Sequence, residues 1–94
     1  MVTIHLASVL RTGAPALHGR TIEPFEGTVG ELLERIATEG GPAFRARLFD
    51  GAVPRRYLNI YVDGTDIRFS GGLATPVGGS ARVDLIPAVA GGSG

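Results

Sequence analysis

The hydrophobic residues of this chain change their spacing along the sequence, and the change limits the folds open to it. Between residues 2 and 10 the apolar side chains fall on one parity: Val2, Ile4, Leu6 and Leu10. A period of two predicts a half-buried β-strand. The segment "RTIEPF", residues 20–25, predicts a second strand that pairs back as a hairpin. Pro24 confines that strand to an edge or an end, because proline cannot donate to a ladder.

The spacing becomes helical after residue 28. Thr28 and Glu31 form the T-x-x-E pattern of a capping box. Apolar residues then lie on one helical face: Val29, Leu32, Leu33 and Ile36. Gly40 and Gly41 predict the end of this helix. The next segment, "PAFRARLFD", predicts a short second helix or turn that begins at Pro42.

Period two returns in "YLNIYVDG", residues 57–64. One face carries Leu58, Ile60 and Val62, and the opposite face carries Tyr57, Asn59 and Tyr61. Asp63-Gly64 is a strong signal for a short hairpin turn. We therefore expect "TDIRF" to be a short pairing strand, and "ARVDLIPAV" to be a last strand whose regular pairing ends at Pro87.

A hairpin, a crossing helix and further strands on the same sheet describe a β-grasp, which is an α+β architecture. We expect a mixed sheet of four to five strands, with one main crossing helix and a short second helix. Residues 1–87 are expected to form the domain. Residues 88–94 are expected to form a flexible C-terminal tail that carries Gly91-Gly92 and two further residues.

The composition excludes several kinds of function. The 94 residues include no cysteine, which removes disulfides, thiolate metal sites and the four cluster ligands of a 2Fe–2S ferredoxin. All nine basic residues are arginine and the formal net charge is zero, so we expect neither a nucleic acid nor a membrane partner. No run of residues predicts a transmembrane segment, and we expect a cytoplasmic protein.

No residue pattern predicts an active site or a metal site. The glycine-rich segments "SGGLAT" and "VGGS" lack the lysine and the following helix of a phosphate-binding loop. Asp63 and Asp66 fit a turn, and Glu31, Glu34 and Arg35 fit a solvated helix face on which Glu31 and Arg35 can pair. We therefore expect a protein that is not an enzyme and binds no cofactor of its own.

The end of the chain is the remaining candidate. From Ala88 to Gly92 an extended ribbon reaches at most about 17 Å, at ~3.3–3.6 Å per residue. Small side chains would let it enter a narrow channel, and Gly91 and Gly92 would let it turn there. Such a ribbon suits delivery of a terminal carboxylate into another enzyme's active site. The alternative is an idle end, since glycine-rich termini are often loose.

The segment "NIYVDGTDIRFSGGLATPVGGSARVDLIPAVAGG" closely resembles the β-grasp sulfur-carrier proteins, the ubiquitin-like carriers typified by ThiS and MoaD. Within that family the likeness is greatest to the CysO-like branch, which serves cysteine biosynthesis. "NIYV", "DIRFSGGLAT" and "IPAVAGG" carry the likeness, which is strong over residues 55–92 and looser before them.

This resemblance implies a mechanism and a set of partners. A ubiquitin-activating-type adenylyltransferase would use ATP to adenylate the carboxylate of Gly92, and a sulfur donor would then convert it to a thiocarboxylate. A pyridoxal-phosphate synthase, or another sulfur-accepting enzyme, would receive the sulfur. A JAMM-type zinc metallopeptidase would release the product. ATP, pyridoxal phosphate and zinc would be used by these partner enzymes, which would recognise the tail through Ala88, Val89, Ala90 and Gly91.

The chain departs from the family pattern after Gly92. Because Ser93 and Gly94 follow it, the Gly92 carboxyl group is an amide as the sequence stands. We expect Ser93-Gly94 to be removed, by a JAMM-type metallopeptidase. The rival explanations are an artificial addition and an inactive form.

The surface that partners recognise is expected to involve exposed apolar side chains. The candidates are Tyr57, Tyr61, Phe69 and Ile86, since aromatic residues are enriched among interface anchors. The alternative role for these residues is packing of the sheet.

Two other functions fit the same sequence. The first is a ubiquitin-like modifier conjugated to target lysines through Gly92, which needs the same activation. The second is a β-grasp interaction module with an inert tail. The species that accumulates on Gly92 distinguishes the carrier from the modifier.

Overall fold

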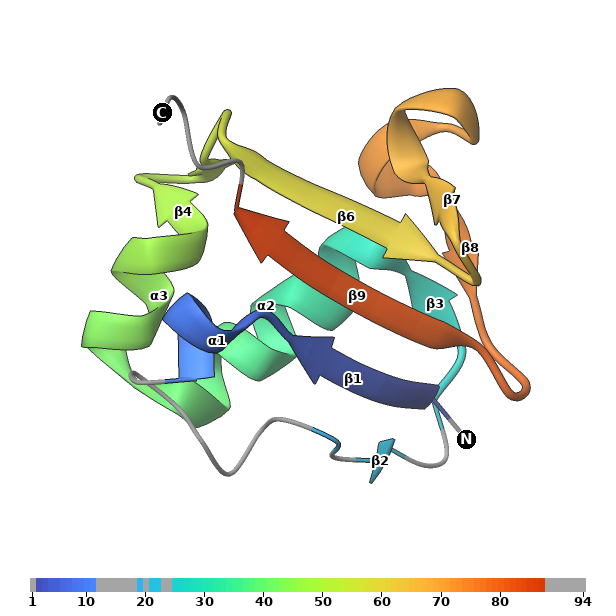
Figure 1. Ribbon diagram of the computed structural model, residues 1–94, viewed down its shortest axis with the longest axis horizontal. Coiled ribbons are helices and arrows are strands. Elements are labelled where there is room, and N and C mark those ends of the chain that lie inside the picture. The colour runs from blue at the N-terminus through green and yellow to red at the C-terminus, as the bar shows by residue number, and fades with distance from the viewer. Residues whose placement is uncertain (1, 12–18, 20, 23–24, 88–94) are drawn as a thin grey trace.

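The computed structural model describes residues 2–11, 19, 21–22 and 25–87. A mixed sheet stands in front of helix α2 (Val29–Gly40), and helix α3 (Pro42–Leu48) lies beside one end of the sheet (Figure 1). The sheet has five strands in the order β2-β1-β9-β6-β7. Their bounds are β1 Val2–Leu6, β2 Thr21–Ile22, β6 Leu58–Val62, β7 Thr65–Asp66 and β9 Arg82–Pro87.

The last strand, β9, lies in the centre of the sheet. It pairs in parallel with β1, where Ile4 is opposite Val83, and antiparallel with β6, where Ile60 is opposite Leu85. The two hairpins, β1–β2 and β6–β7, are thereby joined through the end of the chain. This arrangement confirms the predicted α+β fold with its mixed sheet, its main helix and its shorter second helix.

Helix α2 forms where the capping box predicts it. The main-chain N–H of Glu31 donates to Thr28 Oγ1 at 3.2 Å, and the Thr28 N–H donates to Glu31 Oε1 at 2.8 Å. Because the Glu31 carboxylate is used in this way, the structure pairs Arg35 with Glu39 instead, at 3.5 Å. The helix ends at Gly40, and the next residue, Gly41, caps it with a φ of +90°, in the left-handed region that favours glycine. Its buried residues are Val29, Leu32, Leu33, Ile36 and Ala37.

The core lies between the sheet and these helices. Phe44 and Leu48 of α3 are fully buried against it, which confirms the short second helix beginning at Pro42. The strands contribute alternate residues, as the period-two pattern predicts: Val2, Ile4, Leu6, Leu58, Ile60, Val83 and Leu85.

The first strand is shorter than the parity of its sequence suggests. β1 ends at Leu6, and a single helical turn, α1 (Ser8–Arg11), follows it. Leu10 therefore reaches the core from a helix rather than from a strand. The Arg11 side chain holds this turn against the strand end, since its Nε donates to the Leu6 carbonyl at 2.9 Å. Parity alone could not distinguish the two arrangements, because both bury Leu10.

The segment "TDIRF" is only partly a strand. β7 stops at Asp66, whose side chain accepts a hydrogen bond from the Arg68 N–H and starts a 3-10 turn, η2 (Ile67–Phe69). A second such turn, η3 (Gly72–Ala74), follows. Asp66 thus ends the strand through a local side-chain bond.

Two small ladders were not predicted. β3 (Gly27–Thr28) pairs with β8 (Pro76–Val77), and β4 (Phe49–Asp50) pairs with β5 (Val53–Pro54). Strands of two residues show no period, so the sequence contained no pattern to predict them from.

Two glycines of α2 predict opposite responses to alanine. A Cβ on Gly40 would overlap the ring of the buried Phe44, whereas one on Gly30 would meet Leu73 Cβ at an ordinary 3.5 Å. We expect Gly40→Ala to lower the free energy of unfolding by about 1–3 kcal/mol, because the core must shift. Gly30→Ala should leave it unchanged or raise it by up to about 1 kcal/mol. Urea unfolding measures both, and equal stabilities would contradict this packing.

Candidate functional site

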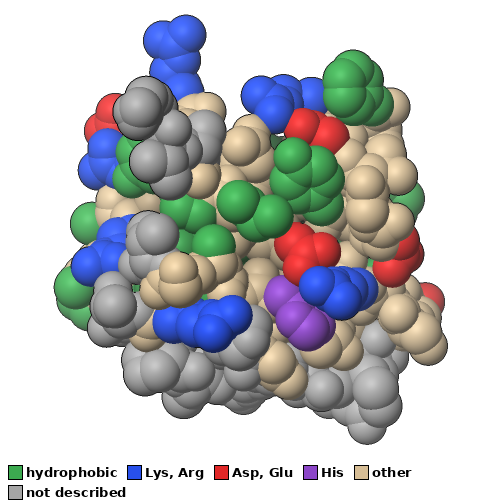
Figure 2. All heavy atoms as spheres, viewed as in Figure 1, with side chains coloured by type: hydrophobic (Ala, Val, Ile, Leu, Met, Phe, Trp, Pro, Cys, Tyr) green, Lys and Arg blue, Asp and Glu red, His purple; other side chains and the backbone are tan. Residues whose placement is uncertain are grey.

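One face of the sheet carries no helix among the described residues. Figure 1 shows α2 on the far side of the sheet and α3 at its end, and Figure 2 shows the near face, where apolar side chains at the centre are flanked by acidic and basic ones. We call this surface the open face. The residues on its strands alternate with the core residues, so the period that buries one set exposes the other.

The centre of the open face comes from two neighbouring strands. Tyr61 of β6 is opposite Asp84 of β9, and Asn59 is opposite Ile86. Tyr61 and Ile86 are therefore diagonal neighbours on one face, within reach of each other's side chains. Ile86 is 43% exposed, which is high for an isoleucine in a central strand.

A bridge of polar groups borders this centre on the β7 side. The Arg68 guanidinium donates to Asp66 Oδ2 and to Asn59 Oδ1, each at 2.7 Å. Hydrogen bonds from the Arg68 side chain, and then from its main-chain N–H, hold the pKa of the Asp66 carboxyl below its usual range. The same pairing raises the pKa of Arg68. This border keeps its charges at neutral pH.

A second charged pair borders the centre on β9 itself. Arg82 and Asp84 approach to 3.1 Å, and both lie on the open face because they are two residues apart in one strand. Asp84 is also opposite His5 of β1. An apolar centre with a charged rim is the usual composition of a protein–protein interface.

The four predicted surface residues do not form one patch. Tyr61 and Ile86 lie together at the centre of the open face. Tyr57, 42% exposed, precedes β6, and its hydroxyl group donates to the Arg47 carbonyl of α3 at 3.4 Å. Phe69 is 86% exposed but belongs to η2, outside the sheet. The two charged pairs were not predicted, although the spacings Asp66-x-Arg68 and Arg82-x-Asp84 are visible in the sequence.

The predicted tail residues lie outside the described residues: Ala88, Val89, Ala90, Gly91, Gly92 and Ser93. The structure does place the start of the tail. Pro87 is opposite Leu58, at the end of the sheet where α3 and β4 also lie (Figure 1). Whatever follows Pro87 begins beside Tyr57, at the margin of the open face.

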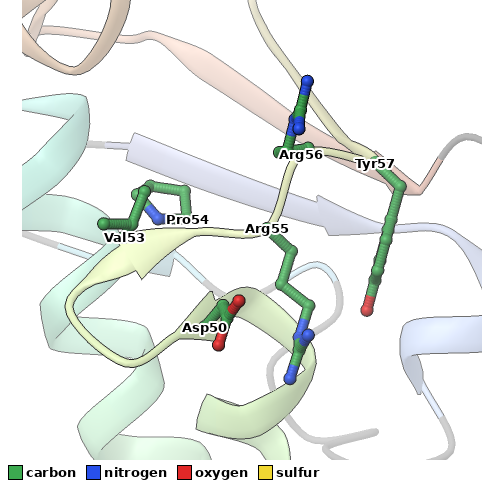
Figure 3. A pocket seen from close by; sticks show the side chains of 6 residues that line it. All are labelled: Asp50, Val53, Pro54, Arg55, Arg56 and Tyr57. Atoms are coloured by element: carbon green, nitrogen blue, oxygen red, sulfur yellow. The ribbon is translucent and has the colours of Figure 1, made fainter.

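A hollow of about 450 Å³ lies at this same end. Figure 3 shows its lining, which comes from β4, β5 and the segment leading into β6. The Arg55 side chain donates to the Ala46 carbonyl at 2.7 Å and so fixes this segment against α3. The lining residues are Asp50, Val53, Pro54, Arg55, Arg56 and Tyr57.

Two other kinds of site, a metal centre and a membrane-spanning helix, have no counterpart among the described residues. In the part of the chain that the structure describes, no three side chains of the metal-binding types gather closely enough to hold an ion. No helix within the same residues has the length and apolar character needed to cross a membrane.

Comparison with known proteins covers nearly the whole chain. The sequence profile described as the ThiS family matches residues 10–92. The curated sulfur carrier protein CysO of Mycobacterium tuberculosis is 34% identical over 96 aligned residues, which cover 97% of this chain and 98% of that protein. CysO of Mycobacterium bovis has the same identity and coverage.

Solved structures share the fold. The structure described as the Amycolatopsis orientalis BexX/CysO complex matches with a TM-score of 0.77 and 32% identity, over 97% of this chain and 99% of that one. Mycobacterium tuberculosis CysO matches with a TM-score of 0.75 and 29% identity, over 95% and 100%. The small archaeal modifier protein 1 of Methanosarcina acetivorans has a TM-score of 0.78 at 23% identity, over 96% and 94%, and shows the fold alone.

The Asp66–Arg68 pair predicts a titration that NMR can follow. We expect Arg68→Gln to raise the pKa of the Asp66 carboxyl toward its usual range, because the main donor is removed. Since the pKa is lowered in the folded state, the pair stabilises the fold above about pH 4, and this contribution is lost as the pH falls further. The matched control Arg82→Gln removes an arginine from the same face and should leave the Asp66 pKa unchanged. A similar rise in both variants would contradict the assignment.

Proposed function

Because this chain belongs to the ThiS family of β-grasp proteins, we propose that it is a sulfur carrier loaded at the carboxyl group of Gly92. The observation that carries this proposal is the extent of the match. The family profile runs to residue 92, and the similarity to proteins named sulfur carriers spans the domain and the tail together.

The chemistry needs an activated carboxyl group. A carboxylate is a poor electrophile, so the partner adenylyltransferase would join Gly92 to AMP at the cost of ATP, with release of pyrophosphate. Hydrosulfide would then attack the carbonyl carbon. The C–S bond forms as the C–O bond to AMP breaks, AMP leaves with the electron pair, and no oxidant or reductant is required. The carrier itself supplies no acid, base or metal to either step.

The separation of the core, on one side of the sheet, from the open face, on the other, supports this role. The core holds the sheet rigid from one side, and the open face is available to a partner next to the point where the tail begins. Tyr61 and Ile86 would seat on the partner, while the charged pairs at the rim would fix the register between the two proteins. The tail residues Ala88–Gly91 would then occupy the channel that leads to the partner's reaction centre.

Delivery of the sulfur would follow on other partners. We propose an acceptor enzyme of the pyridoxal-phosphate type, or another enzyme that takes sulfur from a thiocarboxylate. A JAMM-type zinc metallopeptidase would cleave the adduct on Gly92, and the same class of enzyme would remove Ser93-Gly94 before the first loading. Pathways to cysteine or to another sulfur-containing metabolite both fit this sequence of steps.

Mass spectrometry of the intact protein tests the loading step. A chain ending at Gly92, mixed with the ubiquitin-activating-type adenylyltransferase of the same genome, MgATP and sodium sulfide, should gain the mass difference between sulfur and oxygen. The chain ending at Gly94 should stay unchanged until the metallopeptidase is added. Failure of the shorter chain to gain sulfur would reject the carrier function, and an isopeptide bond from Gly92 to a lysine of another protein would favour the modifier.

The open face predicts a separate kinetic effect. Ile86→Ser and Tyr61→Ala should each raise the KM for the carrier in adenylation by roughly tenfold, with little change in kcat, because a contact of the docking step is lost. Val53→Ser is the matched control, since Val53 is 63% exposed but lies away from the open face. Circular dichroism checks that each variant is folded. An equal effect of all three substitutions would exclude a specific role of the open face.

A further inference from the structure

A hollow of about 250 Å³ lies on the open face beside Ile86, where the end of β1, the turn α1 and β9 meet. Its walls include the apolar residues Leu6 and Ile86 and the charged residues Arg11, Arg82 and Asp84. We call it the Arg11 hollow. Because Ile86 belongs both to this hollow and to the apolar centre of the open face, a partner that covers the centre also closes the hollow.

Two of the charged groups in the hollow neutralise each other. Arg82 Nε donates to Asp84 Oδ1 at 3.1 Å and to Oδ2 at 3.2 Å, so the Asp84 carboxylate is held by its neighbour on the same strand. His5 of β1, which is opposite Asp84 in the sheet, also lines the hollow. Figure 2 shows basic and histidine side chains gathered below the apolar centre of this face. The Arg82–Asp84 pair adds no net charge to the hollow.

The charge of Arg11 is not balanced in this way. Its Nε donates to the Leu6 carbonyl at 2.9 Å, and this acceptor is neutral. Within the part of the chain that the structure describes, the Arg11 side chain makes no other hydrogen bond or ion pair. Because a guanidinium group is a rigid plane, the bond at Nε orients the whole group and leaves the two terminal nitrogens for another acceptor. The hollow therefore contains an oriented cation without a carboxylate of its own.

Docking of a protein on the open face would take Arg11 out of water. Removing an ion from water without giving it a counter-ion opposes binding strongly. A carboxylate is the group that fits a guanidinium best, because its two oxygens match two N–H donors. The apolar walls of the hollow, Leu6 and Ile86, would keep water away from such a pair and strengthen it.

We propose that a carboxylate side chain of the partner enters the Arg11 hollow and pairs with the terminal nitrogens of Arg11 when the partner covers the open face. The inference rests on the proposed function, in which an activating enzyme docks on this face, and it names the chemistry that the enzyme must present there. Arg11 would act as a specificity-determining residue. A protein that placed a basic or an apolar group in the hollow would be rejected, since the charge of Arg11 would be buried without a counter-ion.

Calorimetric titration with the ubiquitin-activating-type adenylyltransferase of the same genome, without ATP, measures docking separately from chemistry. It is done with the full chain and with the chain ending at Gly92. Arg11→Gln should raise the Kd by about tenfold at low salt, and Arg11→Lys should recover most of the affinity. Both variants lose the Nε bond to Leu6, so the difference between them reports the charge alone. The matched control, Arg35→Gln, removes an arginine from α2 and should leave the Kd unchanged.

Salt dependence supplies a second measurement. Raising sodium chloride from about 50 to about 300 mM should weaken binding of the unsubstituted chain more than that of Arg11→Gln, because salt screens the pair that the variant lacks. Equal affinities of the Gln and Lys variants, or no binding of the unsubstituted chain, would overturn the inference. Saturable NMR shifts of the Arg11 Nε–H with about 1 mM sodium phosphate alone would assign the hollow to a free anion and also overturn it. Charge-dependent binding without any later gain of sulfur would contradict only the proposed function.

Discussion

The whole structure depends on β9 being hydrogen-bonded along both of its edges. It is the last strand in the sequence, yet it pairs with the β1–β2 hairpin on one side and with the β6–β7 hairpin on the other. Val83 and Leu85 of this strand are almost completely buried, so the sheet and the core close together. The sheet is therefore complete only when β9 is in place, and β9 ends with Pro87 at the margin of the open face.

The elements with a repeating hydrophobic pattern were predictable from the sequence. Helix α2, strands β6 and β9 and the Asp63-Gly64 turn follow from period, capping box and turn chemistry, and the structure places positive φ angles at both turn residues. The pattern was insufficient at Leu10, which would be buried in a strand as well as in the helical turn that it occupies. It was also insufficient at Asp66, whose side chain ends β7 through a local hydrogen bond. The two-residue ladders had no pattern, because their pairing is set by tertiary contacts.

The residues of the candidate site likewise include some that the sequence could place and some that it could not. Period two placed Tyr61 on the open face beside β9, and the parity of Ile86 followed from that of the buried Val83 and Leu85. Phe69 could not be placed, since its position depends on the 3-10 turn that Asp66 starts. The end of β7 at Asp66 was also beyond the sequence, because a hydrogen bond from the Arg68 N–H to the Asp66 side chain sets it. Edges and turn ends are properties of the assembled sheet.

The core lies on one side of the sheet only. The residues of a strand that face the core and those that face the other way are therefore under different constraints. Val83 and Leu85 must fit their neighbours, whereas Asp84 and Ile86, which alternate with them, lie on the open face, away from α2 and α3. Substitutions on the open face can then accumulate at little cost to folding. After a gene duplication, copies of such a protein could diverge toward different enzymes while the scaffold stayed the same, which is how one small fold can supply several pathways.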